Sequence, residues 1–158
     1  MYYPGHSINS NRKIKKMKHL LIIIMILAAG CSSPSERNTE KYKAQIIKTE
    51  LDFAKMADEA GVAAAFYEYA ADSAVIGRGG KVIKGREAIR EYYEAALKPG
   101  TRLQWAPDFA DVSGDLGYTW GNYTHFVPDS TGQITESHGV FHTVWKRQED
   151  GSWRFVWD

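Results

Sequence analysis

The sequence predicts an α+β fold in which helices come first and an antiparallel sheet follows. Apolar residues at helical spacing dominate most of residues 40–97, whereas aromatic and β-branched residues dominate residues 103–157. Runs of turn-forming residues divide the second part into segments of strand length. Helices followed by antiparallel strands are typical of α+β proteins. With 44% hydrophobic and 13% aromatic residues the chain can fill a core, which excludes disorder of the whole chain.

Three helices are expected before the sheet. The first covers residues 40–60, because its apolar residues recur at helical spacing. One line along this helix carries Ile47, Leu51, Ala54 and Asp58, and the positions beside it are Ile46, Phe53 and Ala57. Gly61 separates this helix from a short second one over residues 62–71. The third helix follows Gly85 and stops at the Pro99-Gly100 pair.

The strands fall into two groups. Two short strands, residues 73–77 and 81–84, flank the Gly-rich turn at residues 78–80 and predict a hairpin. Four longer segments follow, separated by turn residues around Gly114, Gly132 and Gly151. These segments cover residues 103–112, 117–127, 134–147 and 153–157. Their order predicts an antiparallel meander.

The first 30 residues have the layout of an export signal. Residues 20–29 form an apolar run that is preceded by basic residues and followed by small ones. About 20 apolar residues are needed to span a bilayer as a helix, so this run is too short for a stable anchor. Met17 begins a compact version of the signal, and residues 1–16 would then be an over-extended reading frame.

Residues 27–31, Leu-Ala-Ala-Gly-Cys, resemble the bacterial lipobox, in which the cysteine becomes the lipidated first residue. The usual leucine three positions before the cysteine is here Ala28. We therefore expect a signal peptide over residues 1–30, lipidation at Cys31, a flexible tether over residues 31–39 and one domain over residues 40–158. Ser32 is not the aspartate that retains lipoproteins in the inner membrane, which favours the outer membrane of the bacterial envelope. The alternative is a free thiol in a linker and a buried helix.

Charge and cysteine usage exclude a nucleic-acid-binding surface, a disulfide framework and a cysteine zinc site. The first 30 residues hold five basic residues and no acid, so 20 basic against 19 acidic residues become 15 against 19, a formal charge of −4. A nucleic-acid-binding surface needs a concentrated excess of Lys and Arg, and no nucleic-acid partner is expected. A single cysteine excludes an internal disulfide framework and a cysteine zinc site.

Residues 63–94, 115–123 and 139–158 resemble the SnoaL-like and ketosteroid-isomerase-like group of the nuclear transport factor 2-like superfamily. The matching pieces include the stretch 69–75, the Gly-rich hairpin and the segment Gly-Arg-Glu-Ala-Ile at 85–89. The resemblance covers about residues 44–158. It implies a cone: three helices packed on a curved, largely antiparallel sheet, with an apolar cavity between them. One fold hosts many chemistries, so the resemblance does not assign a reaction.

The resemblance also implies that the steroid-isomerase mechanism is absent. The general-base aspartate of those isomerases lies six positions after the equivalent of Asp72, which is Arg78 here. A guanidinium stays protonated near neutral pH and cannot abstract a proton. The oxyanion-holding aspartate of the isomerases falls near His142, whose imidazole could donate a hydrogen bond. We expect no cofactor.

The hairpin centred near Ser130 gives a candidate ligand cavity. In that register Tyr118 pairs with His142, Trp120 with Val140, and Asn122 with His138. These side chains would share one face, with Arg78 at its rim, and would form an aromatic wall with a few polar groups. The same face could instead be ordinary core or a dimer surface, and a slip of one residue would turn it to the other side.

Asp108 and the pair of histidines at 138 and 142 are further candidates for chemistry. Asp108 is either a general base facing the cavity or an exposed charge beside a proline bulge. On a strand His138 and His142 lie about 13 Å apart, too far to share one ion, so no metal site is expected. We favour an envelope lipoprotein that binds a small apolar or aromatic molecule without catalysis. A cofactor-free isomerase, lyase or cyclase is the alternative. Dimerisation is common in the resembled family, but the sequence does not establish it.

Overall fold

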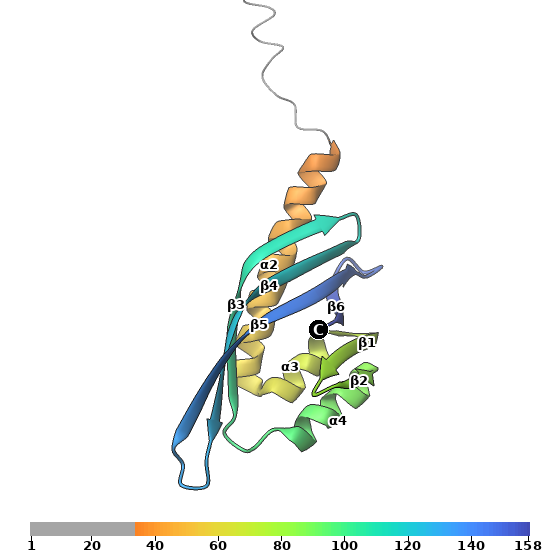
Figure 1. Ribbon diagram of the computed structural model, residues 1–158. Coiled ribbons are helices and arrows are strands. Elements are labelled where there is room, and N and C mark those ends of the chain that lie inside the picture. Colours follow the sequence, from red (N-terminus) through yellow and green to blue (C-terminus); the bar gives the residue numbers. More distant parts are fainter. Residues whose placement is uncertain (1–33) are drawn as a thin grey trace, which may run out of the picture. The chain divides into compact units, whose positions relative to one another are not determined.

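The computed structural model describes residues 34–158, so the expected signal peptide, Met17 and Cys31 lie outside the described residues. Residues Glu36–Asp158 form one compact unit. Its elements, in chain order, are α2 (Pro34–Ala60), α3 (Val62–Tyr69), β1 (Ala70–Arg78), β2 (Lys81–Lys84), α4 (Arg86–Ala96), β3 (Arg102–Ser113), β4 (Leu116–Pro128), β5 (Ile134–Arg147) and β6 (Trp153–Trp157) (Figure 1). No helix of this described part is long and apolar enough to cross a bilayer.

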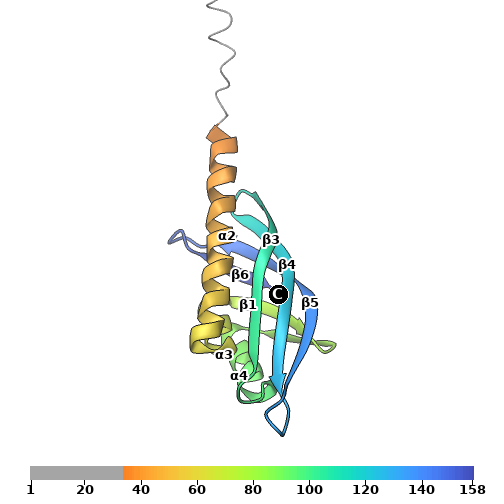
Figure 2. The same ribbon diagram turned by 90° about the vertical axis from the view of Figure 1, so that its left-hand side faces the viewer.

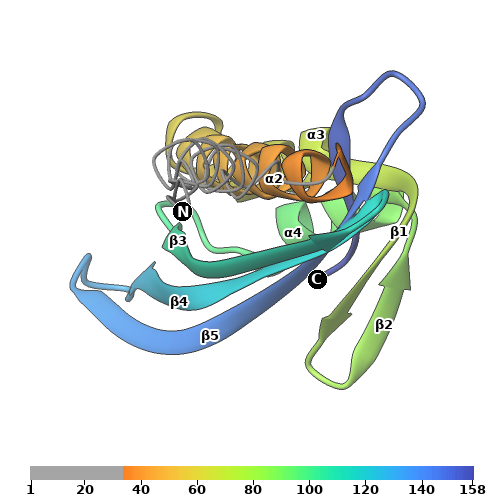
Figure 3. The ribbon, with the colours of Figure 1, turned by 90° about the horizontal axis from the view of Figure 1, so that it is seen from above.

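The expected α+β architecture, with three helices on a mostly antiparallel sheet, is confirmed. The six strands form one open sheet in the order β2-β1-β6-β5-β4-β3. All neighbours are antiparallel except β1 and β6, which run parallel. Seen from above, β3, β4 and β5 curve, and the helices lie on their concave side (Figure 3). Figure 2 shows α2 running along this curved part of the sheet.

The structure differs from the sequence-based boundaries at two places, the start of the first helix and the junction between the second helix and the first strand. The first helix begins at Pro34 instead of residue 40, so six of the nine residues of the expected tether are helical. Proline is well tolerated in the first turn of a helix, where its missing N–H has no partner to lose. The first strand begins at Ala70 because α3 already ends at Tyr69.

The β4–β5 pairing differs from the expected register by two residues. Trp120 lies opposite His142, and Tyr118 lies opposite Val144. Because side chains alternate between the two faces of a strand, a register shift of two residues leaves each side chain on the same face as its predicted partner. That face is the outer one, however, because Thr119 and Thr143 are fully buried while Trp120 stays 40% exposed. The prediction that the aromatic face of β4 lines a cavity is wrong.

Close approach of neighbouring elements explains why the small residues of β4 face inward. A Cβ atom added at Gly117 would lie 3.1 Å from Ile46 Cδ1 of α2 and 2.8 Å from Val112 Cγ2. One added at Gly121 would lie 2.2 Å from the carbonyl oxygen of Ala106. Larger side chains cannot occupy these two positions without moving α2 or β3. At this end of β4 the aromatic residues Tyr118 and Trp120 therefore occupy the opposite face.

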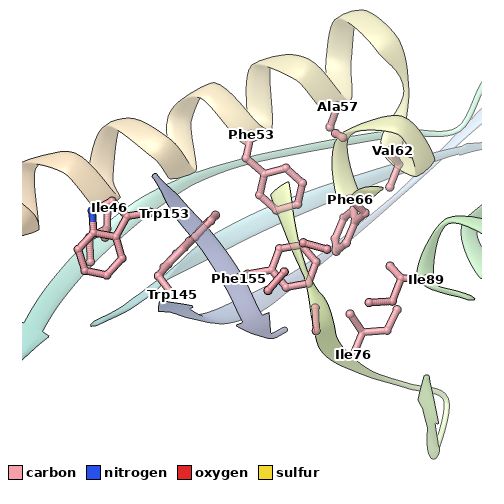
Figure 4. Packing of buried hydrophobic residues seen from close by; sticks show 14 of the residues in the cluster. Ile46, Phe53, Ala57, Val62, Phe66, Ile76, Ile89, Trp145, Trp153 and Phe155 are labelled. Carbon is pink, nitrogen blue, oxygen red and sulfur yellow. The ribbon is translucent and has the colours of Figure 1, made fainter. Parts of the chain in front are cut away.

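The core lies between α2, α3, α4 and the concave face of the sheet. Figure 4 shows Phe53 of α2 close to Phe66 and Phe155, and the ring centroids are 4.8 Å and 5.9 Å apart. The helix line predicted to be apolar is displaced, since Ile47 and Leu51 are 36% and 46% exposed. The buried stripe of α2 instead consists of Ile46, Glu50, Phe53 and Ala57.

Glu50, in the middle of that stripe, accepts hydrogen bonds from residues of three strands. Its Oε1 accepts a hydrogen bond of 2.6 Å from Trp105 Nε1 of β3. Its Oε2 accepts one of 2.5 Å from the Thr119 hydroxyl of β4 and one of 3.1 Å from Trp145 Nε1 of β5. Burial raises the pKa of Glu50 to about 7, and the charge of Asp158 adds to the rise, while the three hydrogen bonds oppose it.

We expect this burial to make the protein less stable as the pH rises. Between the ordinary pKa of 4.5 and the folded value of about 7, the folded protein keeps a proton that the unfolded chain has released. The stabilisation from protonated Glu50 is therefore complete below the unfolded-state pKa of 4.5 and is lost as the pH rises through the folded-state pKa of about 7. The free energy of unfolding falls by about 3 kcal/mol over this range.

Urea denaturation of the wild type and Glu50→Gln, from about pH 5 to about pH 8, measures this contribution. The free energy of unfolding should fall with pH in the wild type, and most of that fall should be missing in Glu50→Gln. Equal pH dependence in the two proteins would contradict the assignment.

Candidate functional site

A pocket of about 530 Å³ lies between the helices and the far half of the curved strands. Its position follows from the pairing of β5, which meets β6 only over Val144–Arg147. In the described sheet the preceding part of β5 has no partner strand on that side, which leaves space between β5 and the end of β1. The volume is typical of sites for small organic molecules.

The pocket wall is aromatic and aliphatic over most of its area. Its apolar members are Phe53, Val62, Phe66, Leu97, Leu103, Trp105, Val140 and Phe141. Phe53 packs edge-on against Trp105, with ring centroids 4.9 Å apart, and against Phe66. Such a wall favours flat, apolar ligands, because aromatic rings bury large areas and stack in defined geometries.

The polar side chains of the wall belong to Arg78, Tyr92, Tyr93, Tyr123, His125 and Asp158. Three of them, Arg78, Tyr93 and Asp158, meet at the end of β1. Arg78 forms an ion pair with Asp158, whose second carboxylate oxygen accepts a 2.8 Å hydrogen bond from the Thr143 hydroxyl. The guanidinium also donates to the Gly77 and Asp158 carbonyl oxygens, at 2.9 Å and 3.0 Å. This network fixes both charges at one end of the pocket.

The charges of this pair compensate one another. Burial lowers the pKa of Arg78, but the Asp158 carboxylate outweighs burial and holds the pKa of the guanidinium above its ordinary value. Arg78 Nε donates a 3.0 Å hydrogen bond to the Tyr93 hydroxyl oxygen. Burial raises the pKa of Tyr93, although Arg78 opposes the rise, so its phenol keeps its proton at neutral pH.

The arrangement offers little for acid–base chemistry. Asp158 is the one carboxylate among the lining residues, and Arg78 and Thr143 already engage both of its oxygens. Glu50 lies in the core and not in the pocket wall. The imidazole of His125 is the remaining group of suitable chemistry.

Of the residues predicted for the cavity, Arg78 and His142 border the pocket, but the imidazole of His142 lies on the outer face of β5, with its centroid 5.6 Å from that of Tyr118. Tyr118, Trp120 and Asn122 do not border it, because they project from the convex face of β4. His138 is on the same outer face of β5, where its Nδ1 lies 3.1 Å from the Thr124 hydroxyl. The sequence pattern separates the two faces of each strand but does not say which face the helices cover.

Asp108 is also outside the pocket. It is exposed next to the irregular pairing of β3 at Pro107, and its Oδ2 accepts a 2.8 Å hydrogen bond from Asn122 Nδ2. Of the two interpretations of Asp108, the general base facing the cavity does not fit this position. The alternative of an exposed charge beside a proline bulge matches its position.

Most of the pocket wall was not predicted for the cavity, including the polar residues Tyr92, Tyr93, Tyr123, His125 and Asp158. The alternation along β4 contained a signal for two of them, because Tyr123 and His125 share a face with Gly117 and Gly121. Small residues at two alternate positions indicate a face that another element approaches closely. No comparable pattern marks Tyr93 or Asp158, whose roles depend on long-range contacts.

Within residues 34–158 no three His, Cys, Asp or Glu side chains lie close enough together to hold a metal ion. Several of the pocket's polar groups already have protein partners, including Arg78 and Asp158. The pocket offers a hydrophobic wall and a neutral polar end.

Comparison with known proteins agrees with this architecture. Residues 44–156 match the family model of the SnoaL-like domain. A nuclear transport factor 2-like superfamily protein from Salmonella enterica is 16% identical, with a TM-score of 0.64 over 75% of this chain and 88% of that one. A ketosteroid isomerase-like protein from Erwinia carotovora atroseptica is 16% identical. Its TM-score is 0.63, and the match covers 73% of this chain and 91% of that one.

The association domain of CaMKII from C. elegans is 15% identical, with a TM-score of 0.58 over 76% of this chain and 95% of that one. No curated protein matches the chain. At these identities the solved structures support the fold alone. The match over residues 44–156, together with the architecture, places the chain in the SnoaL-like domain family of the nuclear transport factor 2-like superfamily.

Proposed function

We propose that the protein is an envelope lipoprotein whose pocket binds a small apolar or aromatic molecule without transforming it. The observation that carries this proposal is the composition of the pocket. Its wall is mainly aromatic and aliphatic, and its one carboxylate, Asp158, is neutralised by Arg78. A site of this kind gains affinity from apolar contact and orients its ligand through a few polar groups.

The second candidate is a cofactor-free isomerase, lyase or cyclase. It is favoured by His125 in the pocket wall and by the similarity to a protein named ketosteroid isomerase-like. Against it stands Arg78, which occupies the position expected for the general base of the steroid isomerases. Catalysis would then depend on His125, because the other acidic or basic groups of the pocket are held in the ion pair.

The proposed attachment to the membrane depends on the sequence before the described residues. Basic residues, a short apolar run, small residues and Cys31 follow one another in the order of a bacterial lipoprotein signal. Lipidation of Cys31 would anchor the protein in the envelope, with the outer membrane favoured.

We also propose that a second copy of the chain covers the outer aromatic patch, which consists of Phe109, Tyr118 and Trp120. These rings lie side by side on β3 and β4. The ring centroid of Phe109 is 5.9 Å from that of Tyr118 and 6.3 Å from that of Trp120. Exposed apolar clusters of this kind mark contact sites between proteins. A patch on one curved face can pair with itself around a two-fold axis. The C. elegans relative in fold is named an association domain.

Ligand binding can be tested with 2-ethylnaphthalene and two alanine variants at the end of α4. Ala95 and Ala96 are both exposed, but only Ala96 lines the pocket. Ala96→Trp should weaken binding by at least about tenfold, a loss of 1.4 kcal/mol, because the indole fills part of the pocket. Ala95→Trp and Trp120→Ala should bind like the wild type in equilibrium dialysis. Absence of saturable binding, or equal affinity in all four proteins, would contradict the proposal.

Membrane attachment can be tested by fractionating cells that express the wild type or Cys31→Ser. We expect the wild type in the membrane fraction with a lipid on its mature N-terminus, and Cys31→Ser in the soluble fraction. Ser32→Ala, which keeps the cysteine, serves as the matched control. The proposal fails if Cys31→Ser stays with the membrane to the same extent as the wild type.

Self-association can be measured by light scattering on Cys31→Ser protein, which avoids detergent. We expect a dimer that becomes a monomer on Trp120→Glu, because a carboxylate in the centre of a buried aromatic interface is strongly destabilising. Val82→Glu changes another exposed apolar residue, on β2, and should leave the dimer intact. A monomer in the parent protein would rule the interface out.

A further inference from the structure

We propose that the ligand of this pocket carries a neutral acceptor oxygen, such as a carbonyl, and that the Tyr93 hydroxyl donates a hydrogen bond to it. This inference rests on the proposed binding function and adds the chemical class of the ligand and the residue that selects it. Four features of the polar end of the pocket support it: the free hydroxyl hydrogen of Tyr93, a guanidinium that is largely engaged by protein groups, balanced charges and a ring fixed by packing.

The free donor is the hydroxyl hydrogen of Tyr93. Its oxygen accepts the 3.0 Å hydrogen bond from Arg78 Nε, and among the described residues it donates to no protein group. A phenol has one hydrogen to donate, and a donor oxygen that already accepts from a cation is polarised toward giving that hydrogen. Because the phenol stays protonated, this donor persists at neutral pH.

The guanidinium of Arg78 is largely engaged. It has five N–H groups, and four of them have protein partners. One goes to Tyr93, two from Nη1 go to the carbonyl oxygens of Gly77 and Asp158, and one from Nη2 goes to the Asp158 carboxylate. We therefore assign Arg78 as a positioning residue that orients Tyr93 and Asp158, with one N–H of Nη2 left over.

Charge balance argues for an uncharged ligand group. The positive charge of Arg78 is paired with the Asp158 carboxylate at the same end of the pocket. An anion entering beside this pair would meet the charge of Asp158 and would lose its hydration without gaining an unpaired cation. A carbonyl oxygen needs only a donor, and Tyr93 supplies one.

The ring of Tyr93 is held in place by its neighbours. It is 7% exposed, and its centroid lies 4.3 Å from that of Phe66 and 5.3 Å from that of Tyr92. Its hydroxyl is therefore aimed by packing as well as by Arg78. A donor that is already oriented loses little conformational entropy when a ligand accepts from it. The apolar body of the ligand would lie against Phe53 and Trp105.

A matched pair of probes tests this inference. 2-Acetylnaphthalene and 2-ethylnaphthalene share one skeleton and differ only by a carbonyl in place of a methylene. The full-length wild type should bind the ketone about three- to tenfold more tightly. In Tyr93→Phe this preference should disappear while the affinity for 2-ethylnaphthalene is kept. Tyr92→Phe removes a neighbouring hydroxyl of the pocket and should keep the preference; its loss there would assign the donor to Tyr92 and overturn the inference.

A second measurement needs no variant. The infrared C=O stretch of 2-acetylnaphthalene bound to the wild type should lie at lower frequency than in hexane, because the bound carbonyl accepts a hydrogen bond. A hexane-like frequency would overturn the inference, as would binding of 2-naphthoate more tightly than the ketone. If neither naphthalene binds, the proposed binding function itself fails. If 2-acetylnaphthalene and 2-ethylnaphthalene bind equally well, and the bound carbonyl keeps a hexane-like frequency, the role of Tyr93 is contradicted while the proposed binding function stands.

Discussion

The fold depends on one buried carboxylate that ties the long helix to the sheet. Glu50 takes three hydrogen bonds from β3, β4 and β5 in a site without solvent exposure. An unsatisfied polar group at such a position would cost several times what a single hydrogen bond contributes, so all three donors must be in place together. This requirement fixes the height and rotation of α2 over the strands. Hydrogen bonds are directional, so they define the position of the helix more narrowly than apolar contact does.

The pocket is a geometric consequence of that attachment. Near Glu50 the helix approaches so closely that β4 presents Gly117 and Thr119 to it. Farther along β4 the inner positions carry the larger Tyr123 and His125, and these line open volume. The sheet is therefore tight against α2 at one end and separated from the helices at the other. Bulky aromatic residues that the tight end cannot accept, such as Trp120, are placed on the outer face.

Local chemistry made most of the fold predictable. The bounds of β5 and β6 follow from turns at Gly132 and Gly151, and α4 begins directly after Gly85, where φ is 90°. Glu50 was not predictable, because a charged residue within an apolar stripe is normally assigned to the solvent side. Its burial depends on tryptophan donors 55 and 95 residues away in the sequence.

The site was predictable only in part for a related reason. Alternation along β4 divides its residues into two sets, and nearness to α2 decides which set is inside. The glycines of β4 hold that information, but their meaning becomes clear only when the position of Ile46 is known. The Arg78–Asp158 pair joins residues 80 positions apart and leaves no local trace at all.

That separation has a consequence for the order of folding. The polar end of the pocket exists only after β6 has aligned parallel to β1, which closes a loop containing most of the domain. Contacts of such long range carry a large chain-closure entropy and form after the local hairpins. The tight attachment of α2 also spans long distances, but the pocket needs the β1–β6 junction in addition. A molecule held at Tyr93, beside the Arg78–Asp158 pair, would thus stabilise only chains that have completed this last closure, so its release and the opening of β6 are linked events.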